Sequence, residues 1–293
     1  MTQVLQDTID AASLGSLYAL FALGVALIFG VGRIANFANG DLLTIAGYLV
    51  VVCATLPWPV VILVACAGPV VLGLAMERFA FRPVRIASPT TLLIVSFAVS
   101  ALLQNGLLLT ATDQPKTTSF GSSLVQPVHL GSVTTTGIDL LDIGVTVVVA
   151  VVLTLVLKRS LIGLKLRAAA EDFLMSRLLG VRANTVMATV FAISAALAGL
   201  AGIMLTIKIG TLTPTFGVQP VTVAFVAAVI GGLGSLLGAA LGGFLVGALT
   251  VVIQSVLPQG LGPYRDAFVF GAVIVLLLVR PQGLMAPATG ERI

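Results

Sequence analysis

Long apolar runs, separated by short polar stretches, dominate this chain. The runs follow neither a 3.6-residue period nor strict alternation, so most segments are apolar on all sides, as helices between lipid and protein are. A helix needs about 20 apolar residues to cross the hydrocarbon layer. Nine runs meet or approach that length: 14–29, 42–54, 60–76, 91–111, 143–157, 185–207, 221–236, 239–257 and 267–279.

The number of spans is eight or nine, because the run 42–54 is short and the runs 221–236 and 239–257 are separated only around Gly238. Short or glycine-interrupted runs are typical of discontinuous or re-entrant helices. Composition agrees with a membrane location, since 58% of the 293 residues are hydrophobic and 9% are charged, against about a quarter charged in soluble domains. The expected fold class is all-α: a polytopic transmembrane helical bundle in which residues 1–293 form a single domain.

The basic residues predict an orientation, because Lys and Arg are enriched in cytoplasmic loops. With nine spans, three of the 15 basic residues, Lys116, Lys208 and Arg265, fall on one side. The N-terminus and the polar loop 112–137 are then extracytoplasmic, whereas the loop 158–184 and the tail 280–293 are cytoplasmic. The predicted cytoplasmic residues are Arg33, Arg78, Arg82, Arg85, Lys158, Arg159, Lys165, Arg167, Arg177, Arg182, Arg280 and Arg292.

Several kinds of chemistry have no support in the sequence. The stretch 209–264 contains no charged residue, and the other spans carry charge only near their ends; ion-coupled carriers usually need a charged group within the membrane. There is no GxxxxGK[ST] phosphate loop, and the single histidine, His129, has no metal-ligand cluster around it. We therefore expect no catalytic residue, metal or cofactor in this chain, and nucleotide hydrolysis must belong to another chain.

The cytoplasmic segment from Arg167 to Val181 is expected to form a short helix outside the bilayer, with an alanine-rich start and a glycine suited to ending it. It is either an amphipathic element at the lipid headgroups or a knob that docks in a cleft of a partner protein, using acidic and apolar side chains. The candidate coupling residues are Arg167, Glu171, Asp172, Leu178, Leu179, Gly180 and Val181.

A polar break at 33–41 separates the first two apolar runs. It is either an ordinary cytoplasmic turn or a break within the membrane that lines a cavity, since its backbone groups cannot face lipid. Polar residues inside or beside other spans face protein or water for the same reason, and each is either structural or part of a solute path. The candidate path residues are Asn36, Asn39, Asp41, Gln104, Asn105, Thr213 and Thr215.

Glycines recur every four residues near the C-terminal end of the chain. This spacing gives smooth helix faces that allow close backbone approach, and helix packing is the preferred interpretation. The candidate packing residues are Gly234, Gly238, Gly242, Gly243 and Gly247.

Seven motifs occur along the chain: GSLYALFALG at 15–24, IANFANGD at 34–41, LLQN at 102–105, the segment 169–180, GGLGS at 231–235, YRD at 264–266 and RPQGL at 280–284. By these motifs, which stand in family order, the chain resembles over nearly its whole length the permease family of high-affinity branched-chain amino acid ABC importers, specifically the shorter of the two permease types that pair in one complex. Two residues depart from the family pattern: Asn39 stands where the family commonly has His, and Leu237 where a proline often follows the GGLGS run.

The resemblance implies the ABC importer permease fold and a complex with a second permease subunit, two ATPase subunits that bind ATP and Mg, and an extracytoplasmic solute-binding protein, in a prokaryotic plasma membrane. No nucleic acid is expected as a partner. Alternating access in this complex would carry branched-chain or other small amino acids. Urea, short amides or small carboxylates are alternative solutes, and an ion-coupled carrier or channel acting alone is the rival from another class. Whether the permeases form a homodimer or a heterodimer is open.

Overall fold

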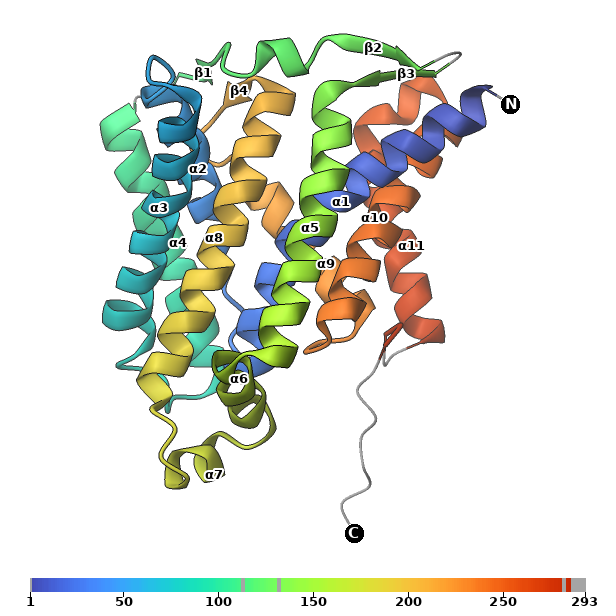
Figure 1. The fold of residues 1–293 in the computed structure, drawn as a ribbon. Coiled ribbons are helices and arrows are strands. Elements are labelled where there is room, and N and C mark those ends of the chain that lie inside the picture. The colour runs from blue at the N-terminus through green and yellow to red at the C-terminus, as the bar shows by residue number, and fades with distance from the viewer. Residues whose placement is uncertain (1, 112–113, 131–132, 281–282, 286–293) are drawn as a thin grey trace.

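The computed structural model describes residues 2–111, 114–130, 133–280 and 283–285. It confirms an all-helical bundle: seven helices in the described part of the chain are long and apolar enough to cross a membrane, and two apolar helices are shorter (Figure 1). The long helices are α1 (Thr2–Gly32), α3 (Trp58–Met76, continued by the π-helical turn η1, Glu77–Phe81), α4 (Pro89–Ala111), α5 (Gly137–Arg159), α8 (Ala183–Ile209), α10 (Leu236–Val256) and α11 (Arg265–Val279, preceded by the 3-10 turn η3, Gln259–Tyr264). The short ones are α2 (Asn39–Val52) and α9 (Val218–Gly231).

Several helices extend beyond the predicted spans, and two boundaries show why. Helix α1 begins at Thr2 instead of residue 14, because the more polar residues before the apolar run include no proline and continue the helix. The runs 221–236 and 239–257 separate at 232–235 instead of Gly238. Gly232 and Gly234 have φ of 103° and 94°, a conformation that favours glycine, and the Ser235 side chain then caps α10 by accepting a hydrogen bond from the Gly238 amide.

The two ends of the bundle carry different structures (Figure 1). At one end, β1 (Lys116–Thr117) pairs antiparallel with β4 (Thr211–Leu212), and β2 (Pro127–Leu130) pairs antiparallel with β3 (Val133–Thr136). The 3-10 turn η2 (Ser122–Leu124) lies between β1 and β2 in the chain. At the opposite end lie α6 (Leu161–Glu171) and α7 (Phe173–Leu178). The polar loop 112–137, called the outer cap below after its predicted side, and the loop 158–184 with the candidate coupling residues are therefore at opposite ends. Most of the tail 280–293 lies outside the described residues.

The order of one long, one short and two long helices occurs twice, in α1 to α4 and in α8 to α11. The packing repeats as well: α2 packs against α8 and α3, whereas α9 packs against α1 and α10. Helix α1 starts beside β3 and α8 ends beside β4, so the two long helices run in opposite directions. The chain thus contains two halves of inverted topology, an arrangement found in many transporters.

Glycines allow the closest helix contacts. Gly243 and Gly247 of α10 lie against Ala19 and Gly15 of α1, and a Cβ atom at either α10 position would overlap the α1 backbone. Between α9 and α10, Gly238 and Gly242 lie against the backbone of Gly231 and Ala227 in the same way. The α9–α10 hairpin is consequently tight. Gly234 lies in the turn, opposite Gly30.

Candidate functional site

The two short helices begin at the same place, deep in the bundle. The residue before α9, Gly217, touches Gly40 in the first turn of α2, and a Cβ atom on Gly217 would overlap the Gly40 carbonyl oxygen. The Gly217 amide donates a 2.8 Å hydrogen bond to the Thr44 hydroxyl oxygen. From this point α2 extends toward the β4 end, while the end of α9 is bonded to the segment after α11, through Leu284 N and Ile230 O at 2.7 Å. Residues 36–41 with Gly217 are called the crossing below.

The polar residues of the crossing are buried: Asn36, Asn39 and Asp41 are 4%, 1% and 1% exposed. An ordinary surface turn would leave these three side chains in water, so at Asn36, Asn39 and Asp41 the break is enclosed by protein. Gln104 Nε2 donates to Asp41 Oδ1 at 2.9 Å, and Ser194 of α8 donates to Asn39 Oδ1 at 3.2 Å. Four buried atoms of the crossing have no hydrogen-bond partner in the described structure: Asn36 Nδ2, Asn36 Oδ1, Asn39 Nδ2 and Asp41 Oδ2.

Helix α4 supplies a polar stripe to the crossing. Ser96 accepts a 2.7 Å hydrogen bond from the Phe37 amide, and Ser100 accepts one of 3.1 Å from Gln104. Beside the stripe, the Phe37 ring stacks on Phe97 with ring centroids 4.8 Å apart. We did not predict the two serines, although their spacing of four residues from each other and from Gln104 places all three on one helix face.

The other candidate path residues lie outside the crossing. Asn105 is exposed on α4, and its amide donates to its own helix at Ala101 O, 2.7 Å away. Thr213 and Thr215 are exposed in the connector from β4 to α9. Thus the structure brings Gln104 to Asp41 but turns its sequence neighbour Asn105 away, because adjacent helix positions face different directions.

A second carboxylate–amide hydrogen bond joins the short helix of the other half to its last helix, at an exposed position. Gln219, in the first turn of α9, donates to Asp266 Oδ2 of α11 at 2.8 Å, as Gln104 of α4 does to Asp41 of α2. Asp266 also pairs with Arg265 at 3.2 Å. Asp266 belongs to the YRD motif at 264–266, whereas Gln219 was not predicted from the sequence.

The predicted single coupling helix is wrong: two helices, α6 and α7, are present. The Ser160 side chain caps α6 by accepting a hydrogen bond from Gly163 N at 3.0 Å, so the helix starts before Arg167. It ends at Asp172, whose backbone is extended and whose Oδ1 accepts from the Met175 amide. Gly180, at φ 87°, ends the segment after α7.

This segment exposes apolar side chains at the end of the molecule, since Leu178 and Leu179 are 75% and 80% exposed. Arg167, Glu171 and Asp172 are exposed beside them. A cleft of about 400 Å³ lies between α6 and α8; its lining includes Leu166, Leu179, Gly180, Val181, Arg182 and Thr185. The surface combines apolar and charged groups around a recess.

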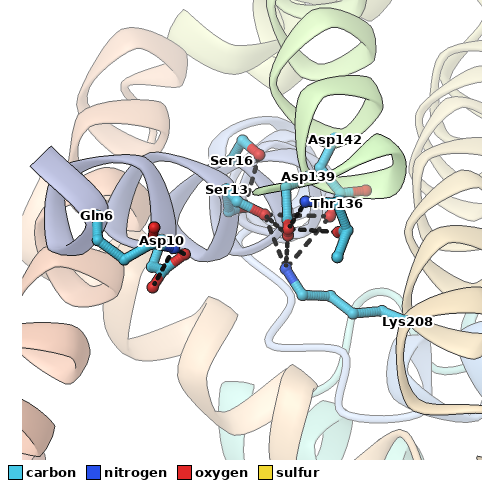
Figure 2. A network of polar contacts seen from close by, with 8 residues as sticks. All are labelled: Gln6, Asp10, Ser13, Ser16, Thr136, Asp139, Asp142 and Lys208. Atoms are coloured by element: carbon cyan, nitrogen blue, oxygen red, sulfur yellow. Dashed lines mark hydrogen bonds and ion pairs between the residues drawn. The ribbon is translucent and has the colours of Figure 1, made fainter. Parts of the chain in front are cut away.

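A polar network joins three helices at the β-strand end of the bundle (Figure 2). Lys208 Nζ of α8 lies 2.7 Å from Asp139 Oδ1 and 3.6 Å from Asp142 Oδ2, both on α5. It also donates to the Ser13 hydroxyl of α1 at 2.7 Å. Thr136 caps α5 through Asp139. We did not predict this network, although all three charged residues lie near the ends of their helices, as expected.

Comparison with known proteins extends over nearly the whole chain. The family described as branched-chain amino acid transport system / permease component matches residues 8–278. The permease protein BraD of the high-affinity branched-chain amino acid transport system of Pseudomonas aeruginosa is 33% identical over 99% of this chain and 98% of its own. The corresponding LivH of Salmonella typhimurium is 32% identical over 99% and 97%, and LivM of Escherichia coli is 26% identical over 96% and 71%. No solved structure matches.

Proposed function

This chain belongs to the branched-chain amino acid transport permease family, and from that premise we propose that it carries branched-chain amino acids through the crossing by alternating access. As a member it is the multi-pass, non-catalytic permease component of an ABC importer. The observation that carries the proposal is the crossing: two half-length helices begin together inside the bundle, beside buried polar groups. Transporters commonly bind solutes where discontinuous helices of inverted repeats meet.

The path residues in this proposal are Asn36, Asn39, Asp41 and Gln104. Their unpartnered buried atoms support a solute role, because buried polar groups in native proteins nearly always have a partner. A solute or a chain of waters passing the crossing would supply that partner. Weak contacts would suffice, since a solute held tightly here would leave slowly.

The partners in this proposal follow from the exposed ends of the bundle. The α6–α7 surface, with Glu171, Leu178 and Leu179, would dock one of two ATPase subunits, which bind ATP and Mg and drive the conformational change. An extracytoplasmic binding protein would deliver solute to the cap at the β-strand end. A second, related permease completes the path; the similarity to both LivH and LivM favours a heterodimer.

The orientation in this proposal places the β-strand end outside a prokaryotic plasma membrane and α6–α7 in the cytoplasm. The distribution of basic residues supports it: Lys158, Lys165, Arg167 and Arg182 lie at the α6–α7 end, whereas Lys116 and Lys208 lie at the other.

The test is uptake of labelled leucine by proteoliposomes that contain the complex purified from its host. We expect uptake only when ATP is supplied on the cytoplasmic face of the complex and loaded binding protein on the opposite face. Uptake without ATP would replace the importer by an ion-coupled carrier or channel. Binding-protein-stimulated ATP hydrolysis with uptake of urea or a small carboxylate, but not of leucine, would retain the importer and reject the amino acid substrate.

A further inference from the structure

We propose that Asp41 binds the ammonium group of the transported amino acid and that Gln104 positions the Asp41 carboxylate for it. The inference rests on the proposed function and deepens it, because it assigns one chemical group of the solute to one side chain. It concerns the one acidic residue of the crossing, which is 1% exposed.

The Asp41 carboxylate has two polar side-chain neighbours, Gln104 and the Ser100 hydroxyl, yet one of its two oxygens remains without a hydrogen bond. Its Oδ1 accepts a 2.9 Å hydrogen bond from Gln104 Nε2, while its Oδ2 is buried without a hydrogen-bond partner. No ion pair in the described part of the chain involves Asp41. Asp41 is therefore a buried acid for which the described residues provide no cation.

A buried carboxylate without a cation is costly, because the interior does not replace the hydration that the charge loses. Acidic groups within membrane segments mark solute or ion paths for this reason. The cation that the proposed function brings to the crossing is the ammonium group of the amino acid. Its three N–H donors suit a carboxylate oxygen that has free acceptor capacity.

The surroundings give the carboxylate a fixed direction. Gln104 donates both to Asp41 and to the Ser100 hydroxyl at 3.1 Å, so its amide is held by two partners. The hydrogen bond from Gln104 Nε2 to Asp41 Oδ1 leaves Oδ2 to accept a hydrogen bond from the solute. Gln104 acts through Asp41 and is thus a positioning residue.

The experiment compares Asp41→Asn, Asp41→Glu and Gln104→Leu in the full complex, with Asp10→Asn as the matched control for loss of a carboxylate outside the crossing. Leucine transported per ATP hydrolysed is measured in proteoliposomes. We expect Asp41→Asn to lower this ratio about tenfold or more, the loss of one charge-assisted hydrogen bond, while ATP hydrolysis is still stimulated by loaded binding protein. Asp41→Glu and Gln104→Leu should retain part of the ratio, and Asp10→Asn all of it.

A binding measurement then identifies the chemical group. Leucine is bound to the solubilised complex without binding protein and followed by saturation-transfer NMR, with isoamylamine or 4-methylpentanoate as competitor. Isoamylamine should compete in the wild type but not in Asp41→Asn, whereas 4-methylpentanoate should compete equally in both. Equal competition by isoamylamine in both proteins, or an unchanged transport ratio in Asp41→Asn, overturns the proposal. A wild-type complex that does not transport leucine contradicts the proposed function instead.

Discussion

Asn36 is the residue at which stability and function conflict most plainly. Both polar atoms of its amide are buried without a partner in the described structure. Leaving a buried polar group unsatisfied costs about 1–3 kcal/mol, so a residue selected for stability alone would be apolar here. The amide is better explained as a group reserved for a passing solute.

The first prediction compares Asn36→Leu with Asn105→Leu, the same change on the exposed face of α4. Asn36→Leu should leave the melting temperature of the purified complex unchanged or raised, because it removes an unsatisfied amide, yet should lower leucine uptake about tenfold. Asn105→Leu should transport at the wild-type rate, since its amide bonds only to its own helix. Normal uptake by Asn36→Leu would reduce this residue to a packing group.

At this scale the sequence predicted part of the site. Asn36, Asn39 and Asp41 stood out because they interrupt two apolar runs, and polar groups among apolar ones need a reason. Gln104 and Asn105 were indistinguishable, because only the helix direction decides which of two neighbours faces the crossing. Ser194 could not be predicted, since the hydroxyl of a single serine in an apolar helix normally bonds to the backbone of that helix.

At the scale of elements, the Lys208 network fixes α8 to α1 and α5 just before the chain leaves α8 for β4. β4 in turn pairs with β1 of the outer cap and leads down to the crossing. These contacts connect the outer cap to the start of α9. A binding protein that docks on the cap would act on the crossing through these contacts.

The second prediction concerns Lys208→Met, with Lys116→Met as the control for removal of a cation at the same end. Loss of Lys208 leaves the Asp139 and Asp142 carboxylates without their cation. Breaking a fully buried pair in this way costs on the order of 3 kcal/mol of unfolding free energy. The expected loss is smaller here, because the lysine side chain is 28% exposed and solvent screens its charge. Thermal unfolding of the detergent-purified chain measures it. The double variant with Asp139→Asn should recover part of the loss; no recovery would contradict an electrostatic cause.

The third prediction concerns Leu179→Asp on the α6–α7 surface, with Val125→Asp in the outer cap as the matched control. An apolar anchor that is 80% exposed in the isolated chain should be buried in the ATPase interface, where a carboxylate would lose its hydration. We expect Leu179→Asp to insert normally but to lose co-purification with the ATPase, and Val125→Asp to keep it. Retained co-purification of Leu179→Asp would move the docking site elsewhere.

Elements were easier to predict than their joints. Every long apolar run became a helix, because length and hydropathy alone decide a span. The prediction for the coupling segment was wrong in detail. The first helix starts before the alanines that follow Arg167, at the Ser160 cap. The break at Asp172 depends on the hydrogen bond that its side chain accepts from Met175 N. Such caps form only once the neighbouring backbone is placed.

At the scale of the whole molecule, the inverted halves place the crossing between the outer cap and the α6–α7 surface. The sequence indicated nine apolar runs but not the inverted repeat, since the two halves are alike in the order of helix lengths and in helix packing and not in amino-acid sequence. Symmetry matters for function, because two equivalent halves can exchange conformations around a fixed solute site. Alternating access to the crossing is therefore the central claim.

The most direct measurement is accessibility of a single cysteine, Ser100→Cys, which faces the crossing, in a complex whose Cys53 and Cys66 are replaced by serine. A membrane-impermeant thiol reagent is applied from either side of the proteoliposome, without nucleotide and with a non-hydrolysable ATP analogue, and Ser122→Cys in the outer cap serves as the control labelled from outside throughout. Labelling of Ser100→Cys should switch from one side to the other when the nucleotide binds. Labelling from the same side in both states, or in neither state, would contradict the account.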